Sequence, residues 1–428
     1  MLINRNYTWL WAGKTVSLTG DFIFDTTVLL WVATVLLRGE PNAPIVSGAV
    51  LAVVSLTMLL VGPAAGVLVD RWPDKRAVML RADLIRAGLI GGLAAAAALP
   101  ATAVRQPVLL GLIGVVVAAS TAVAQFFNAA RFVVIGDVVP AGQRGRATGY
   151  AQATAAVAAM VGPPAAGPLL FGLGPQWAMT ANAASFLVSY LAIRAVRTAP
   201  QPGRPAARAG IGRDYLAGLR VISGSRILTG VLLSRTVAIL GAGAVTALDV
   251  YFVAENLHAD PRTWFGVLSA TLAAGAFTGG LLGGPLADRF GPARVYPVAA
   301  LANGCLMLAY SQMQAIGPAL PVAFAETLTV GVMASATMPL FLALVPRQYQ
   351  GRVSSVLTLS YHLPSLISAL LAGIIVAIVR RIDVVFAAAG LLILVAGGYA
   401  LWALRPDRTD QNTDPDARRA DSPRTTST

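Results

Sequence analysis

The 428-residue sequence contains a single cysteine and only two histidines. Cys305 therefore has no partner for an intrachain disulfide, and no cysteine and histidine cluster suggests a metal site. So few histidines also disfavour a catalytic triad. Charge is equally scarce, because charged residues make up 12% of the chain, against about 25% in a soluble domain. A soluble protein needs charge to cover its surface, so this composition argues against a soluble enzyme.

Apolar residues, in contrast, make up 56% of the chain, or about 240 residues. A helix needs ~20 apolar residues to cross ~30 Å of hydrocarbon, so this content supplies roughly twelve membrane helices. The net charge of +13 comes mainly from arginines that border apolar runs, a pattern that sets membrane topology rather than one that binds nucleic acid. We therefore expect an all-α, polytopic membrane protein.

Charge clusters and turn residues divide the apolar runs into two sets of six predicted helices. The first set is expected at Leu10–Leu37, Ile45–Val69, Ala77–Leu99, Val108–Ile135, Thr148–Phe171 and Met179–Val196. The second set is expected at Ile227–Val253, Trp264–Leu286, Val295–Met313, Ala319–Val345, Val353–Val379 and Val384–Leu404. The predicted domains are thus an N-terminal bundle (1–196), a linker (197–226), a C-terminal bundle (227–404) and a disordered tail (405–428). Within the linker, Asp214–Ile222 has the spacing of a helix on the membrane surface.

An internal repeat supports this division. Gly66–Trp72 matches Gly284–Phe290 at an offset of 218, Val139-Pro140 matches Val345-Pro346 at 206, and Lys14 matches Arg235 at 221. Three ordered matches indicate two pseudo-symmetric six-helix bundles, the arrangement expected of a secondary transporter with its site at the interface. Arginine and lysine concentrate in loops after even-numbered helices, so the positive-inside rule places both termini and the linker in the cytoplasm.

The repeated loop resembles the signature of the major facilitator superfamily between its second and third helices. The residues that carry the resemblance are Gly66, Leu68, Asp70, Arg71, Lys75 and Arg76, with a second copy at Leu286, Asp288, Arg289 and Gly291. Pro73 and Asp74 depart from the pattern. The opening Asn4–Tyr7, with Trp11 and Gly20-Asp21, resembles the branch of bacterial macrolide-efflux and siderophore-export proteins.

The resemblance implies a gating role for the repeated loop, in which Asp70 holds the cytoplasmic side shut against the eleventh helix. The alternative is that Gly66, Asp70, Arg71, Asp288 and Arg289 only set topology. The helix at Thr148–Phe171 is similar to the fifth-helix motif of antiporters through Gly149, Gly162, Pro163 and Gly167, although Ala158 and Ala166 replace two glycines. This similarity favours export over import. Small residues and proline would also permit close helix packing alone.

Ionisable side chains inside the membrane cost at least ~2.5 kcal/mol each at the helix centre, so each needs an explanation. Asp21 and Asp25 lie four residues apart on one face of the first helix. Two close carboxylates in a low dielectric oppose joint ionisation, which suits a proton-coupling site or a receptor for a cationic compound. Asp21 is the expected proton carrier because Gly20-Asp21 fits the resembling branch. Structural carboxylates bonded to Thr26 or Thr27 are the alternative.

In the second half, Ala242 and Thr246 align with these aspartates, and Glu326 is the candidate for coupling there. A buried structural carboxylate is an equal alternative for Glu326. Asp83 and Arg86 are expected to pair with one another. Polar and aromatic residues that could line a cavity are Gln125, Phe126, Asn128, Tyr150, Gln152, Asn303, Phe341 and Tyr361.

These features predict a secondary active transporter that exports a hydrophobic or amphipathic, drug-like molecule by proton antiport. The alternative within transport is an exporter of an endogenous metabolite, siderophore or lysolipid. A non-transporting receptor or a membrane-embedded enzyme is the alternative from another class. Ala12–Thr15 lacks the first glycine of a P-loop, so no ATP site, other cofactor or metal is expected. The expected partners are the bilayer of the inner (cytoplasmic) cell membrane, a small-molecule substrate and protons, and a monomer would suffice.

Overall fold

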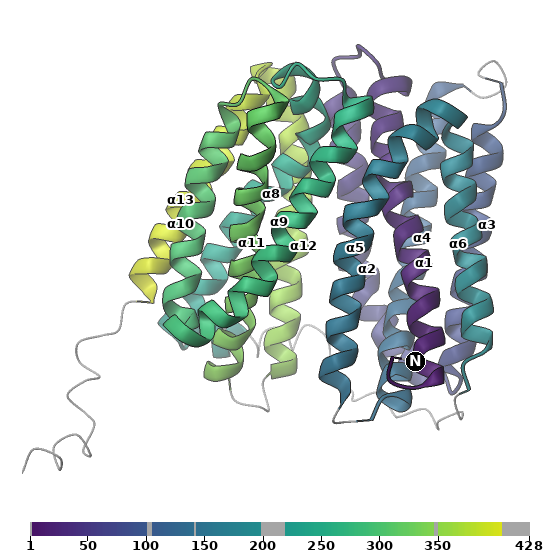
Figure 1. The fold of residues 1–428 in the computed structure, drawn as a ribbon, viewed down its shortest axis with the longest axis horizontal. Coiled ribbons are helices and arrows are strands. Elements are labelled where there is room, and N and C mark those ends of the chain that lie inside the picture. The colour runs from purple at the N-terminus through teal and green to yellow at the C-terminus, as the bar shows by residue number, and fades with distance from the viewer. Residues whose placement is uncertain (1, 101–104, 141–142, 198–218, 346–349, 405–428) are drawn as a thin grey trace, which may run out of the picture.

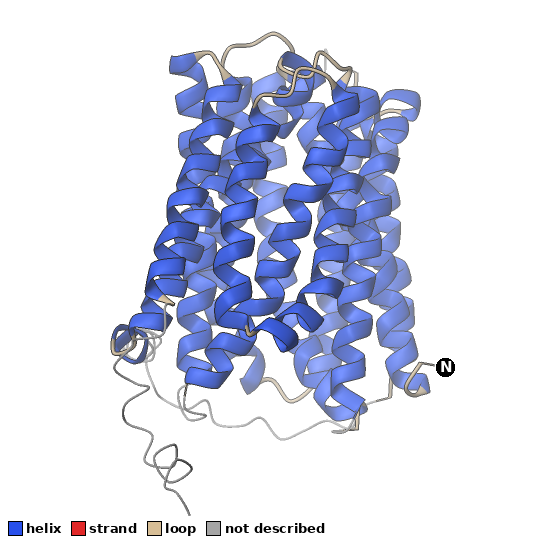
Figure 2. Ribbon diagram, turned by 60° about the vertical axis from the view of Figure 1, so that its left-hand side comes forward, coloured by secondary structure: helices blue, strands red, loops and turns tan. Residues whose placement is uncertain are grey.

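A computed structural model describes residues 2–100, 105–140, 143–197, 219–345 and 350–404. The described residues form helices and connecting turns and contain no strand (Figure 2). The first half holds α1 (Arg5–Trp31), α2 (Ala43–Arg71), α3 (Lys75–Ala97), α4 (Gln106–Val138), α5 (Arg144–Pro168) and α6 (Pro175–Arg194). Short π-helical turns, η1 (Val32–Leu36) and η3 (Leu169–Leu173), continue α1 and α5. The second half holds α8 (Arg226–Glu255), α9 (Pro261–Phe290), α10 (Pro292–Ser311), α11 (Ile316–Leu344), α12 (Gln350–Val379) and α13 (Ile382–Ala403).

These twelve long helices of the described chain confirm the all-α membrane fold expected from composition. Nine of them, counted over the described residues, are long and apolar enough to cross a membrane by themselves. The remaining three are α3, α6 and α10. α3 carries five charged side chains, among them Asp83 and Arg86, which lowers its hydropathy although it packs among the others.

Helix ends differ from the prediction by a few residues because polar caps, not apolar runs, set them. α1 begins at Arg5 rather than Leu10, since the Asn4 side chain accepts a hydrogen bond from the Tyr7 amide at 2.8 Å. α3 begins at Lys75, where Asp74 accepts from the Ala77 amide at 2.9 Å. The described part of the predicted surface helix is helical over 219–223. Its first residues, 214–218, and the tail 405–428 lie outside the described residues.

The helices pack as two groups. α1 packs against α5 and α6, and α3 packs against α4 and α6. In the second half, α9 and α10 both pack against α11, and α13 packs against α8 and α10. The groups meet mainly where α2 lies along α12 and α5 along α9. Figure 1 shows the two groups side by side, drawn closest at the end opposite the N-terminus. We call the end that holds the N-terminus the linker end and the opposite end the distal end.

The buried apolar core is also continuous between the two groups at the distal end and divided at the linker end. One buried cluster spans both groups at the distal end and includes Leu30 of α1, Leu248 of α8 and Phe386 of α13. Towards the linker end the core divides into separate clusters, one around Met79 and Phe127 within the first group and others that do not cross between groups. Among the described side chains, the apolar burial that joins the two bundles therefore lies at the distal end.

Small residues permit this close approach. A Cβ atom on Gly373 of α12 would lie 2.7 Å from the Ile45 Cα of α2, and one on Gly266 of α9 would lie 2.7 Å from the Pro164 Cα of α5. Both neighbours are backbone atoms that cannot move aside cheaply. Where the bundles touch, the Ser47 and Tyr251 hydroxyls also share a buried hydrogen bond of 2.7 Å.

We expect Gly373→Leu to force the bundles apart at the distal end, because overpacking of a close contact costs about 1–3 kcal/mol. Spin labels on the exposed residues Glu40 and Gln314, which lie on distal loops of the two bundles, should report a longer and broader distance distribution. The control Gly88→Leu, at a helical glycine with open space around it, should leave the distribution unchanged. An unchanged distribution in Gly373→Leu would contradict this account of the contact.

Candidate functional site

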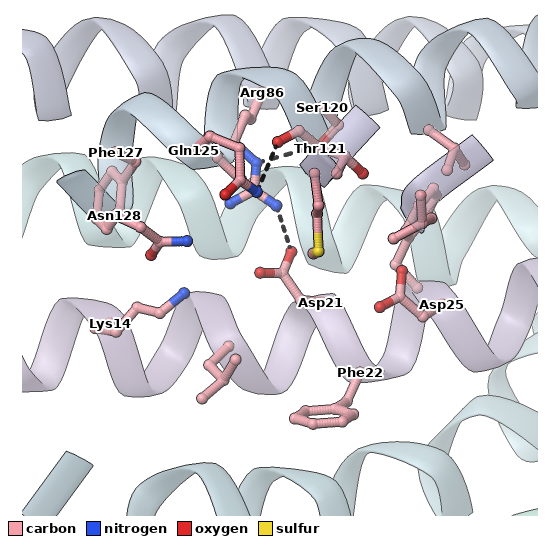
Figure 3. A pocket seen from close by; sticks show the side chains of 16 residues that line it. Lys14, Asp21, Phe22, Asp25, Arg86, Ser120, Thr121, Gln125, Phe127 and Asn128 are labelled. Carbon is pink, nitrogen blue, oxygen red and sulfur yellow. Dashed lines mark hydrogen bonds and ion pairs between the residues drawn. The ribbon is translucent and has the colours of Figure 1, made fainter. Parts of the chain in front are cut away.

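The candidate site begins with the side of α1 that carries Lys14, Asp21 and Asp25. Figure 3 shows all three side chains on the same side of the helix, towards α4. An adjacent side of α1 lies close to α6, because Gly20 has no side chain there. A Cβ atom at Gly20 would lie 2.7 Å from the Asn182 Oδ1 atom. Gly20 therefore allows α1 to pack closely against α6, and the next residue, Asp21, points away from α6.

Asp21 forms an ion pair with Arg86 of α3. The Arg86 Nη2 atom donates to the Asp21 Oδ1 atom at 2.9 Å, and the two side chains are 9% and 18% exposed respectively. The Arg86 Nε atom also donates to the Ser120 hydroxyl of α4 at 3.1 Å, as the dashed lines in Figure 3 show. The guanidinium lies 4.0 Å from the centre of the Phe186 ring of α6. One arginine thus ties four helices of the first bundle together.

This pairing corrects one expectation from the sequence. Arg86 takes its ion-pair partner from α1 rather than from the neighbouring Asp83. Residues three apart on α3 could have met each other, but the packing of α3 against α4 and α6 points Arg86 towards Asp21. Asp83 is 1% exposed and lies beside the Ser189 hydroxyl of α6.

A cavity of about 230 Å³ opens beside the ion pair and is lined by α1, α2, α3 and α4. Asp25 is exposed into this cavity, although protein surrounds it, and makes no hydrogen bond to a described residue. The Lys14 ammonium lies 5.7 Å from the centre of the Phe127 ring and interacts electrostatically with Asp21 and Asp83. The cavity therefore holds one paired carboxylate, one carboxylate without an ion-pair partner and a lysine.

A second cavity of about 290 Å³ adjoins the first towards the linker end. Lys14, Leu18 and Asn128 line both cavities, and Arg131 and Gln152 line the second. Polar side chains thus follow α1 and α4 from Asp25 to the linker end. Such a path can carry a proton or a polar part of a substrate.

Several cavity residues expected from the sequence do lie here. Gln125 and Asn128 line the first cavity, Gln152 lines the second, and Tyr150 packs nearby, with its hydroxyl 3.5 Å from the Arg146 Nη2 atom. Sequence analysis missed Ser120 and Phe186, the partners of Arg86. A serine and a phenylalanine in apolar runs give no signal by themselves.

The candidates of the second half do not join this site. Glu326 of α11 is 6% exposed and accepts a hydrogen bond from Asn303 of α10 at 2.7 Å. Tyr361 of α12 is 48% exposed and contacts His362, whereas Phe341 is buried in the core of the second bundle. Thr246, which aligns with Asp25, donates to the Ala242 carbonyl of its own helix at 3.1 Å.

Around the loop after α2, basic side chains of α3 donate hydrogen bonds to carbonyls at the ends of neighbouring helices. The Lys75 ammonium donates to the Val69 carbonyl at 2.6 Å, near the end of α2. The Arg76 Nε atom donates to the Ile193 carbonyl at 3.1 Å, near the end of α6. Arg71, Asp288 and Arg289 are exposed, and Gly66 has open space around it. The side chain of Asp70 lies outside the described part of the chain.

The glycines expected in the fifth-helix motif serve different contacts. A Cβ atom on Gly162 would lie 2.5 Å from the Phe22 Cβ atom of α1, and one on Gly167 would lie 2.5 Å from the Arg262 carbonyl of α9. Pro163 presents its carbonyl to Gly266 of α9. Gly149 is exposed with open space around it. The motif therefore packs α5 against both α1 and the second bundle.

Comparison with known proteins agrees with this architecture. A family model described as transmembrane secretion effector matches residues 2–359, and no curated protein sequence matches the chain. The chain is similar in structure to a bacterial homologue of the iron transporter ferroportin in an inward-facing state, with a TM-score of 0.73, 14% identity and coverage of 94% of this chain and 99% of that one. It is also similar to a bacterial homologue of the human lysosomal transporter Spinster in an inward-facing, unoccupied conformation, with a TM-score of 0.70, 15% identity and coverage of 94% and 97%. These identities show a shared fold.

We expect Arg86→Met to destabilise the protein by about 3 kcal/mol, because it leaves Asp21 as an unpaired charge in a low-dielectric site. Asp21→Asn in the Arg86→Met background should recover much of that loss, since it removes the stranded charge. Thermal unfolding of the purified protein in detergent checks this with the four proteins of the double-mutant cycle. Additive losses in the double variant would show that the two side chains do not interact.

Proposed function

The chain belongs to the transmembrane secretion effector family and is a membrane transporter of the major facilitator type, and from this premise we propose that it exports a hydrophobic or amphipathic small molecule by proton antiport. The observation that carries the proposal is the convergence of Lys14, Asp21, Asp25 and Arg86 on one cavity of the first bundle. Ionisable groups are retained at this depth only where they serve a pathway or pair with one another. Here one carboxylate is paired, whereas the other faces the cavity.

On the basis of the ion pair, we propose a different division of roles from the one expected from the sequence, in which Asp21 was the proton carrier. Asp21 is held by Arg86 at 2.9 Å, so its carboxylate is engaged in the ion pair and orients the guanidinium. Asp25 has no ion-pair partner among the described residues and faces the cavity. We assign proton exchange to Asp25, with Asp21 as the neighbouring charge that affects its protonation. When Asp25 gives up its proton, it becomes a binding site for a cationic or polar part of the substrate.

Alternating access follows from how the bundles are joined. Their shared apolar core and glycine contacts lie at the distal end, so rocking about the interface would open that end and close the linker end. We propose that Asp70, Arg71 and Gly66, with Asp288 and Arg289 of the repeated loop, form the gate at the linker end. Gly162, Pro163 and Gly167 would let α5 slide against α1 and α9 during this motion.

The resemblance of the opening residues Asn4–Tyr7 to macrolide-efflux and siderophore-export proteins supports an exported, drug-like substrate. The cavity agrees, since it combines charged groups with apolar walls such as Val54, Met58 and Phe24. An amphipathic molecule would place its polar part beside Asp25 and its apolar part against these walls.

We propose that the linker end faces the cytoplasm of the cell, because Arg71, Lys75, Arg76, Arg289 and Arg294 all lie there. Ser223 is exposed near this end. In a Cys305→Ser background, Ser223→Cys should resist an impermeant thiol reagent added to intact cells and react after permeabilisation. The matched control Glu40→Cys, exposed at the distal end, should react in intact cells. Labelling of Ser223→Cys but not of Glu40→Cys in intact cells would show that the linker end faces outward.

For coupling, we expect Asp25→Asn to abolish gradient-driven export of a lipophilic cationic dye from proteoliposomes, because the amide cannot exchange a proton. Downhill dye exchange should survive, since the cavity and the ion pair are intact. Glu40→Gln, which neutralises an exposed distal carboxylate, is the control and should behave as the unaltered protein. Gradient-driven export that persists in both Asp25→Asn and Asp21→Asn would remove proton coupling from this cavity.

A further inference from the structure

A second group of ionisable side chains lies inside the second bundle, away from the cavity. It consists of Asp249 on α8, Tyr310 on α10 and Glu326 on α11, which are 7%, 2% and 6% exposed respectively. None of the three lines the two cavities of the first bundle. The proposed export mechanism makes no use of Asp249 or Tyr310.

Glu326 is well supplied with hydrogen bonds. The Asn303 Nδ2 atom donates to the Glu326 Oε1 atom at 2.7 Å and contacts the Glu326 carbonyl at 3.1 Å and the Thr329 hydroxyl at 2.9 Å. Because a backbone carbonyl can only accept, the contact at 3.1 Å fixes the orientation of the Asn303 amide. Glu326 therefore receives a donor that stabilises its carboxylate.

Asp249 has no comparable support. Its Oδ1 atom is buried without a hydrogen-bond partner, and so is the Tyr310 hydroxyl. The Tyr310 ring centre lies 5.0 Å from that of Phe252, which follows Asp249 by three residues on α8. The charge of Glu326 acts on Asp249, and both carboxylates act on the Tyr310 hydroxyl. Three groups that can hold or share a proton thus lie within electrostatic range of one another, and two of them have an unused polar atom.

No basic side chain in the described part of the chain offsets the two carboxylates. The other ionisable residues of the surrounding helices whose side chains are described are Arg71 on α2, Arg226, Arg235, Tyr251 and Glu255 on α8, Arg262, Asp288 and Arg289 on α9, Arg294, Tyr296 and Cys305 on α10, Tyr361 and His362 on α12, and Asp383 and Tyr399 on α13. None of these is among the groups whose charge acts on Asp249 or Glu326. Two buried negative charges without a cation would be strongly unfavourable, so the group must hold a positive species.

We propose that Asp249, Glu326 and Tyr310 form a second proton-binding centre inside the C-terminal bundle, with the proton on Asp249. A protonated Asp249 removes one of the two negative charges, and the remaining charge on Glu326 is stabilised by the hydrogen bond from the Asn303 amide. A proton fits better than a metal cation, because the Asn303 amide turns its donor side, not its oxygen, towards Glu326. The proposal is independent of export and of Asp25, and it adds a site where the second bundle can take up a proton.

The test is infrared difference spectroscopy of the purified, full-length protein, with pH as the variable and no substrate present. The unaltered protein should show the carbonyl band of a buried, protonated carboxyl group that persists to neutral pH. Asp249→Asn should lose this band, whereas Asp25→Asn and the control Asp383→Asn, which removes a carboxyl bound to Arg381 at the distal end, should keep it. Retention of the band in Asp249→Asn, or its absence from the unaltered protein, overturns the proposal.

Tyr310→Phe provides an independent test if Asp249→Asn fails to fold. It removes the hydroxyl but keeps the ring that packs against Phe252 and Phe386, at centroid distances of 5.0 and 5.9 Å. The band should shift in frequency, because the dipole of the hydroxyl lies within electrostatic range of the Asp249 carboxyl. An unmoved band would overturn the centre as described. Loss of the band when sodium chloride is added to the unaltered protein would replace the proton with a metal cation and also overturn the proposal.

Discussion

The ion pair between Asp21 and Arg86 is the interaction on which the first bundle depends. A charge at the centre of a membrane helix costs ~2.5–3.5 kcal/mol on insertion scales, and a partner at 2.9 Å offsets that cost. Because Arg86 also binds Ser120 and packs on Phe186, the pair fixes the relative positions of α1, α3, α4 and α6. That arrangement leaves Asp25 and Lys14 facing a cavity rather than lipid.

The two bundles offset the cost of burying charged side chains in different ways. The first bundle sets cations, Lys14 and Arg86, beside its carboxylates and places them along an open cavity. The second bundle buries Asp249 and Glu326 without a basic partner among the described residues, and only Glu326 receives a hydrogen bond, from the Asn303 amide. The two bundles therefore have six long helices each but place different ionisable side chains inside them. In the described part of the chain, apolar burial and glycine contacts join the bundles at the distal end, and we propose that the bundles rock about this interface.

Sequence alone predicted the features that depend on local periodicity. The apolar runs gave the helices, and the four-residue spacing of Asp21 and Asp25 placed both carboxylates on one side of α1. It did not predict the partner of Asp21, because Arg86 lies 65 residues away and meets it only through helix packing. The burial of Glu326 against Asn303 depends in the same way on how α10 meets α11. Helix ends were missed where a single cap, such as Asn4 or Asp74, outweighs hydropathy.

The central claim is that a proton gradient drives export through the first bundle. The most direct measurement is uptake of a panel of amphipathic compounds into inside-out vesicles that contain the unaltered protein, with and without an imposed pH gradient. The account predicts that at least one compound accumulates when the vesicle interior is acidic, and that a protonophore abolishes the accumulation. Accumulation that is the same without a gradient, or that requires an alkaline interior, would contradict it.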